Sequence, residues 1–182
     1  SVEDTSVVID PFGPLSVALA YGTEIEWVKD FGFLGRKWEK LRFIGNYTFL
    51  RTEVPLNNQT KRTLEEEFGD LFEEGAIPER RRLYGQPNHT INALLVFSDP
   101  TNTGLEFSAG YDYFGARIVG VLDQGINIVE NGRGLLSASF QKTFKNGVSI
   151  RFRANNLLDP EYKQVYKIIG TNKEINTFES YR

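Results

Sequence analysis

Leu135–Asn156 reads LLSASFQKTFKNGVSIRFRANN and contains the pattern that decides the fold. Apolar and polar residues alternate over Leu135–Phe144 and again over Val148–Asn156. Alternation with a period of two is typical of a strand whose two faces meet different surroundings. Between the two segments lies Lys145-Asn146-Gly147, and Asn-Gly is a strong signal for a tight hairpin turn. The stretch therefore predicts two long antiparallel strands.

The same alternation recurs along the chain and predicts about seven strands in all. It is clear in Leu41–Arg51 and Leu105–Phe114, and weaker in Leu15–Trp27 and Thr90–Phe97. A last strand is expected to begin near Thr177. Because consecutive strands are joined by turns, we expect an all-β, antiparallel, up-and-down sheet.

The connections alternate between short and long, which gives the second signal. The short ones are expected at Gly32–Lys37, Asp99–Thr103 and Lys145–Gly147, and the long ones at Pro55–Arg80, Leu122–Arg133 and Asp159–Asn176. Short turns at one rim and long loops at the other are typical of outer-membrane β-barrels, whose long loops are extracellular. This alternation of short and long connections predicts that the loop at about 55–80 is extracellular.

That long loop is predicted to contain one helix. Thr63 followed by Glu66 fits a capping box, and Gly75 can end the helix. Leu64 and Phe68 fall on one face, together with Leu71 and Phe72. We expect an exposed acidic helix whose apolar stripe packs on neighbouring loops.

Composition narrows the class of protein. The 182 residues include no cysteine and 13% aromatic residues, and the net charge is −3. The charge argues against a nucleic-acid-binding protein, and the missing cysteines exclude a disulfide framework. The mean hydropathy of −0.34 averages over alternating faces, so it fits a membrane barrel as well as a soluble protein. Ser1-Val2-Glu3-Asp4 has no initiating Met and no apolar segment after it, so we expect a mature form or a fragment of a longer protein.

Six short segments resemble the end of TonB-dependent outer-membrane receptors, especially those of Bacteroidetes. Tyr111–Ile118 is similar to the family pattern Y-N-x-x-G-x-R-I, and Glu130 with Arg133 is similar to E-x-x-R. The other matching segments are Arg82–Pro87 with Thr90–Asn92, Asn155–Asp159, Tyr21–Glu26 and Gly45–Phe49. The chain departs from the family at its end, because it stops at Glu179–Arg182 where the final aromatic pattern would begin.

The resemblance implies that residues 1–182 are the C-terminal portion of a transmembrane barrel of about 22 strands, without its plug domain and without the end of its last strand. It implies a bacterial outer-membrane transporter that takes up a scarce nutrient, such as an iron chelate, cobalamin, a glycan or a peptide. Energy would come from the TonB complex acting on the plug, and the other partners would be outer-membrane lipid and the rest of the barrel. No enzymatic activity, cofactor or nucleic acid is expected.

The barrel lumen is where substrate-binding residues are expected. The lumen-facing candidates are Asn46, Glu106, Asp112, Arg151 and Arg153, and we expect the two arginines to pair with Glu106 or Asp112. No metal ligands and no catalytic residues are assigned.

Two other functions are compatible with the sequence. One is a soluble β-barrel that binds a small molecule around a dry core of Phe, Tyr and Leu. The other is a secreted carbohydrate-active β enzyme, with Glu24, Glu26 or Asp112 as its acids. The only histidine, His89, is expected near the extracellular rim, and Arg80–Arg82 is either a site for an anion or a solvated loop edge.

Overall fold

The computed structural model describes residues 17–73, 76–122, 124–171 and 173–181. Apart from one helix and three short 3-10 segments, its regular structure is β. The strands are β1 (Leu19–Asp30), β2 (Leu41–Pro55), β3 (Arg80–Arg81), β4 (His89–Asp99), β5 (Leu105–Phe114), β6 (Arg117–Val121), β7 (Ile126–Glu130), β8 (Arg133–Thr143), β9 (Ser149–Ala154), β10 (Tyr162–Ile168) and β11 (Glu174–Tyr181). The helix is α1 (Asn58–Phe68), and the 3-10 segments are Gly32–Leu34, Arg36–Trp38 and Gly69–Leu71.

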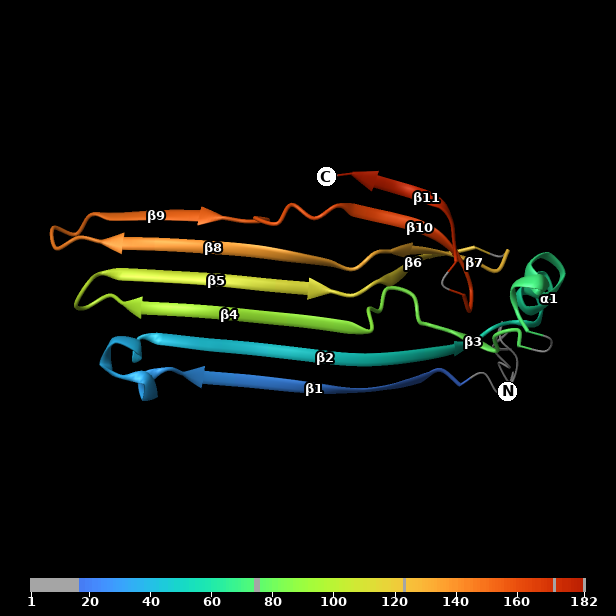
Figure 1. The fold of residues 1–182 in the computed structure, drawn as a ribbon, viewed down its shortest axis with the longest axis horizontal. Coiled ribbons are helices and arrows are strands. Elements are labelled where there is room, and N and C mark those ends of the chain that lie inside the picture. The colour runs from blue at the N-terminus through green and yellow to red at the C-terminus, as the bar shows by residue number, and fades with distance from the viewer. Residues whose placement is uncertain (1–16, 74–75, 123, 172, 182) are drawn as a thin grey trace, which may run out of the picture.

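The strands form an antiparallel, up-and-down sheet, as the sequence predicts. One sheet has the order β1-β2-β4-β5-β8-β9, with β3 also paired to β2, and a second has the order β11-β10-β7-β6. Figure 1 shows that β6 continues the path of β5, β7 leads into β8, and β10 continues β9. The chain therefore runs as about seven long strands, several of them interrupted, each next to its neighbours in sequence. Among the described residues β1 pairs only with β2 and β11 only with β10, so this sheet does not close on itself.

All the connections fall at two ends of the sheet. Residues 31–40, 100–104 and 144–148 lie at the left end in Figure 1, and the α1 segment with the β6–β7 and β10–β11 turns lies at the right end, which we call the α1 end. The predicted long loops Leu122–Arg133 and Asp159–Asn176 are wrong in their lengths, because β7 lies within the first, and all of β10 and the start of β11 lie within the second. Irregular backbone separates β5 from β6 and β7 from β8, and it hides these strand extensions in the sequence.

The registers place the alternating residues on two distinct faces of the large sheet, because paired residues of neighbouring strands point to the same side. The apolar face includes Ile25, Trp27, Phe43, Tyr47, Leu95, Phe97, Phe107, Ala109, Tyr111, Tyr113, Leu136, Ala138, Phe140, Phe152 and Ala154. The polar face includes Glu24, Glu26, Asn46, Thr48, Asn92, Glu106, Ser108, Asp112, Ser137, Ser139, Gln141, Arg151 and Arg153, and it has one apolar row, Val28, Ile44 and Leu94.

Nothing in the described chain covers the apolar face. Trp27 is 63% exposed and Phe152 66%, and Phe107 and Phe140, which are register partners, are 39% and 40% exposed. The dry internal core required by a soluble β-barrel is therefore not formed by these Phe side chains.

The buried apolar residues gather instead at the α1 end. One cluster joins Leu64 of α1 to Leu56, Ile168 and Ile169, and a second joins Ile118, Val129 and Val165 of the small sheet. In the first cluster α1 packs on the turn between β10 and β11, as expected for its apolar stripe. The helix begins earlier than predicted, because the side chain of Asn57 accepts a hydrogen bond from the Thr60 amide (2.7 Å) and acts as the N-cap in place of Thr63.

The helix ends at Phe68, well before Gly75, which lies outside the described residues. Neither α1 nor any other described helix is long and apolar enough to span a bilayer.

Candidate functional site

The five lumen-facing candidates share the polar face. Asn46 and Asp112 lie in one row across the strands, and Glu106 lies in a second row with Gln141 and Arg151. Arg153 lies in a third row, opposite Ser139. The registers place these five residues on the same side of the sheet. That this side faces a lumen, and that the residues bind a substrate, stay predictions.

The predicted ion pairs of Arg151 and Arg153 with Glu106 or Asp112 are wrong for the described residues. Instead, Arg151 Nε donates to Gln141 Oε1 (2.6 Å). Glu106 accepts from Ser98 Oγ (3.4 Å), because Ser98 is its own register partner. A shallow hollow of 280 Å³ lies among these side chains. The polar face is thus covered with hydrogen-bonded pairs between strands, with room for solvent or solute above them.

One of the three acids considered for catalysis, Glu24, makes a contact between strands, and so does the only histidine. Glu24 accepts a hydrogen bond from Asn46 Nδ2 (2.7 Å) on the neighbouring strand. His89 begins β4 towards the α1 end, and its Nδ1 lies 3.0 Å from Tyr47 Oη. No group of three or more His, Asp or Glu side chains in the described ranges has the geometry of a metal site. Nothing in this arrangement distinguishes an active site.

Motif residues from separate segments meet in one ionic cluster. Glu130, whose side chain is 8% exposed, lies 2.9 Å from the Arg117 guanidinium and 3.4 Å from that of Arg133. Arg117 belongs to the Y-N-x-x-G-x-R-I-like segment, and the other two form the E-x-x-R-like segment. Two cations therefore hold a buried carboxylate where the large and small sheets meet.

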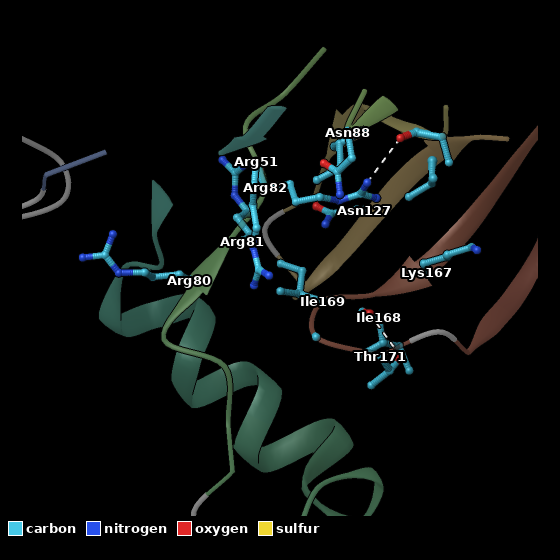
Figure 2. A pocket seen from close by; sticks show the side chains of 14 residues that line it. Arg51, Arg80, Arg81, Arg82, Asn88, Asn127, Lys167, Ile168, Ile169 and Thr171 are labelled. Carbon is cyan, nitrogen blue, oxygen red and sulfur yellow. Dashed lines mark hydrogen bonds between the residues drawn. The ribbon is translucent and has the colours of Figure 1, made fainter. Parts of the chain in front are cut away.

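A larger recess lies at the α1 end, and the sequence indicates only part of it. Its volume is 610 Å³ (Figure 2), and its cationic side chains are Arg51, Arg80, Arg81, Arg82 and Lys167. We call it the arginine recess. Its described lining contains no acidic residue. Arg80 is exposed, as a solvated loop edge would be, whereas Arg81 and Arg82 are half-buried in the wall of this recess.

Backbone pairing positions the three consecutive arginines. Arg80 and Arg81 pair with the end of β2, and the Leu83 amide donates to Thr52 Oγ1 (3.1 Å). The Gly85 amide then donates to the carbonyl of Ile118 (2.7 Å), and Gly85 has a φ of +77°, which glycine adopts without strain. The segment therefore bridges β2 and β6 and fixes one wall of the arginine recess.

The electrostatics of the arginine recess are unbalanced. Burial lowers the pKa of the Arg81 and Arg82 guanidinium groups from the ordinary arginine value, yet both stay charged at neutral pH. Arg81 Nη1 donates to the carbonyl of Arg82 (3.1 Å), and Arg82 Nη1 donates to the carbonyl of Ala116 (3.2 Å). In the part of the chain that the structure describes, neither has a carboxylate partner. By contrast, Arg51 pairs with Glu53 (3.0 Å) and Lys167 with Glu174 (3.3 Å).

Two amide oxygens in the arginine recess have no hydrogen-bond partner among the described residues. They are Oδ1 of Asn88 and Oδ1 of Asn127, and Asn127 is only 6% exposed. Figure 2 shows both amides beside Arg82. Sequence reasoning missed Arg51, Asn127 and Lys167, because no local motif marks them and only the strand extensions bring them together.

No protein-family model, no curated protein and no solved structure matches this chain. The resemblance to TonB-dependent receptors therefore stays a prediction from short segments. The features that bear on function are the two faces of the large sheet and the arginine recess.

Proposed function

We propose that this chain forms part of the wall of an outer-membrane β-barrel that transports a solute, of the TonB-dependent receptor type. The observation that carries the proposal is the exposed apolar face, which lies opposite a hydrogen-bonded polar face on one antiparallel, up-and-down sheet. In such a barrel, the apolar face contacts lipid and the polar face lines the lumen.

The dimensions of the apolar face suit a bilayer. β5 has 10 residues and β4 and β8 have 11 each, which are the ~9–11 residues that a strand tilted by about 45° needs to cross the hydrocarbon. Their apolar residues form a band across the sheet. Trp27, Tyr47, Tyr111 and Tyr113 lie towards one edge of this band, and Phe97, Phe107, Phe140 and Phe152 form the row at the other edge. Aromatic residues at both edges of an apolar band about 25 Å tall are typical of outer-membrane barrels.

The two edges of the sheet also require further strands. Backbone groups without partners are costly in hydrocarbon, so only a closed barrel allows strands to cross a bilayer. The outer edges of β1 and β11 therefore pair with other strands of the complete barrel. The expected plug domain and the TonB complex would supply the driving force for transport, as the resemblance implies.

Site-directed fluorescence in lipid tests this proposal directly. In the full-length protein, reconstituted in vesicles, Ala109→Cys and Ser108→Cys would each carry a bimane label, since the chain contributes no cysteine of its own. These neighbours lie on the apolar and polar faces, respectively. We expect brominated lipid to quench the label at position 109 severalfold more than the label at position 108. Equal quenching, or a protein that needs neither lipid nor detergent, would favour the soluble binding protein.

A further inference from the structure

We propose that the arginine recess binds a solute that carries both an oxyanion group, phosphate or carboxylate, and neighbouring hydroxyl groups. This inference deepens the proposed function, since it names the class of solute held at the α1 end of the sheet. Its binding chemistry depends only on residues that the structure places together.

The charge of the recess selects the oxyanion. Two of its five cations have carboxylate partners, and Arg80 is exposed, donates to the Val17 carbonyl (3.2 Å) and points away from the other arginines (Figure 2). Among the described residues, the positive charge left without a carboxylate partner in the recess is therefore that of Arg81 and Arg82. Half-burial of Arg81 and Arg82 removes part of their hydration, which makes an uncompensated charge costly. An oxyanion offers the guanidinium groups paired acceptors in the geometry that arginine prefers.

The buried amides select the hydroxyl groups. In the part of the chain that the structure describes, no donor reaches Asn127 Oδ1 or Asn88 Oδ1, and both are acceptors. A bare oxyanion brings only acceptors, so it would leave these oxygens unsatisfied. A hydroxyl group donates to an amide oxygen while its neighbouring oxyanion contacts the arginines. The recess therefore favours a solute with both groups over either group alone.

The remaining surface suits a compact polyhydroxylated ring. The volume of 610 Å³ lies within the range of ordinary small-molecule sites. Ile118 and Val129, which are 2% and 3% exposed, close the recess from below and leave little apolar surface in it. An acidic or phosphorylated sugar carries both the oxyanion and the hydroxyl groups.

The same chemistry occurs in a free solute and in the phosphorylated sugar headgroup of lipopolysaccharide. Backbone pairing fixes the segments that line the recess, so the recess is preformed, and we assign it to a free solute. An experiment must therefore distinguish the two sources.

Isothermal titration of the purified full-length protein in detergent micelles provides the test. The probes are glucose 6-phosphate, inorganic phosphate and glucose. We expect glucose 6-phosphate to bind at least tenfold more tightly than either of the others, with an affinity that falls as salt rises. Equal binding of inorganic phosphate would overturn the role of the amides, and no binding of any probe would overturn the site.

Variants assign the binding to named side chains. Arg81→Gln and Arg82→Gln, tested separately, should each weaken glucose 6-phosphate binding at least tenfold. Arg62→Gln on the exposed side of α1 removes the same charge outside the recess and should change the affinity less than twofold. Asn127→Leu should weaken binding of glucose 6-phosphate but not of inorganic phosphate. Unchanged affinity in both arginine variants, confirmed as folded by circular dichroism, would refute the assignment.

Nanodiscs separate the two sources of the ligand. Glucose 6-phosphate should bind equally in phosphatidylcholine nanodiscs with and without lipopolysaccharide. Competition by lipopolysaccharide that disappears in Arg81→Gln would assign the recess to a lipid headgroup and overturn the free-solute proposal. Because the micelle titration does not depend on which face meets lipid, failure here and failure of the bimane experiment are distinguishable.

Discussion

The assignment of the two faces makes a sharp prediction for neighbouring residues on β8. Ala138 lies on the apolar face, in the row that joins Leu95, Ala109 and Ala154. Ser137 points to the opposite face, where its register partner Gly110 has no side chain. An arginine at position 138 would enter hydrocarbon, whereas an arginine at position 137 would enter the polar lumen.

The register shows how deep position 138 lies in the apolar band, and this depth determines the free-energy cost of an arginine there. Ala138 is two residues from the Phe140 row and four from the Gly134 row, which is about 7 and 14 Å along the strand. It therefore lies within about one residue of the centre of the apolar band. Arginine near the bilayer midplane costs a barrel about 2–4 kcal/mol, so Ala138→Arg should lower the folding equilibrium constant about 30- to 900-fold.

Ser137→Arg is the matched control. It removes only a long hydrogen bond from Ser137 Oγ to the Gly110 carbonyl (3.4 Å), so we expect a cost within about 1 kcal/mol. Both variants are measured by reversible urea unfolding of the full-length protein in lipid vesicles. A cost for Ser137→Arg equal to or greater than that for Ala138→Arg would show that the faces are assigned the wrong way round.

Three further changes test the elements that support the wall and the loops. Leu64→Ala should destabilise the packing of α1 by about 2–5 kcal/mol, because this side chain is fully buried. Hydrogen exchange of the α1 amides measures this loss of stability, and Glu65→Ala at an exposed position is the control. Gly147→Val should cost about 1–2 kcal/mol in urea unfolding, because Gly147 has a φ of +85°, and a smaller cost would mean that the hairpin tolerates another turn. Glu130→Ala should lower the free energy of unfolding in urea by about 1–3 kcal/mol, because Arg117 and Arg133 lose their shared carboxylate. An unchanged free energy of unfolding would contradict a structural role for this ionic cluster.

The sequence contains enough information for the sheet because its signal is repetitive. Alternation in segments such as Leu105–Phe114 repeats over ten residues, and tight turns such as Asn146-Gly147 fix which strands are neighbours. A one-residue shift in register would exchange the two faces, so the pattern also predicts which residues share a face. The positions of Asn46, Asp112 and Arg151 follow from this rule alone.

The arginine recess could not be predicted in the same way. Its lining comes from β2, β3, β6, β7 and β10, and irregular backbone interrupts the alternation before several of these strands. Asn127 and Lys167 are register partners, yet the sequence pattern predicts long loops around both of them. Arg80–Arg82 was the visible part of the site, and its half-burial depends on contacts with Thr52 and Ile118 that no local pattern encodes.

The distribution of buried residues links the large sheet and the arginine recess to one physical cause. The fully packed apolar residues, from Leu56 and Leu64 to Ile168 and Ile169, all lie at the α1 end, where a loop folds back on short strands as in a water-soluble domain. Among the described residues, the large sheet has no such core, although its apolar face holds most of the large aromatic residues. In water that face would aggregate, since a contiguous exposed apolar surface of this size is rare in soluble monomers. In a bilayer it needs no protein partner, because hydrocarbon solvates it directly. Among the described residues, the conventional core lies only outside the large sheet, which is the organisation that the proposed barrel requires. There, lipid would stabilise the strands, and ordinary packing would shape the proposed site at their end.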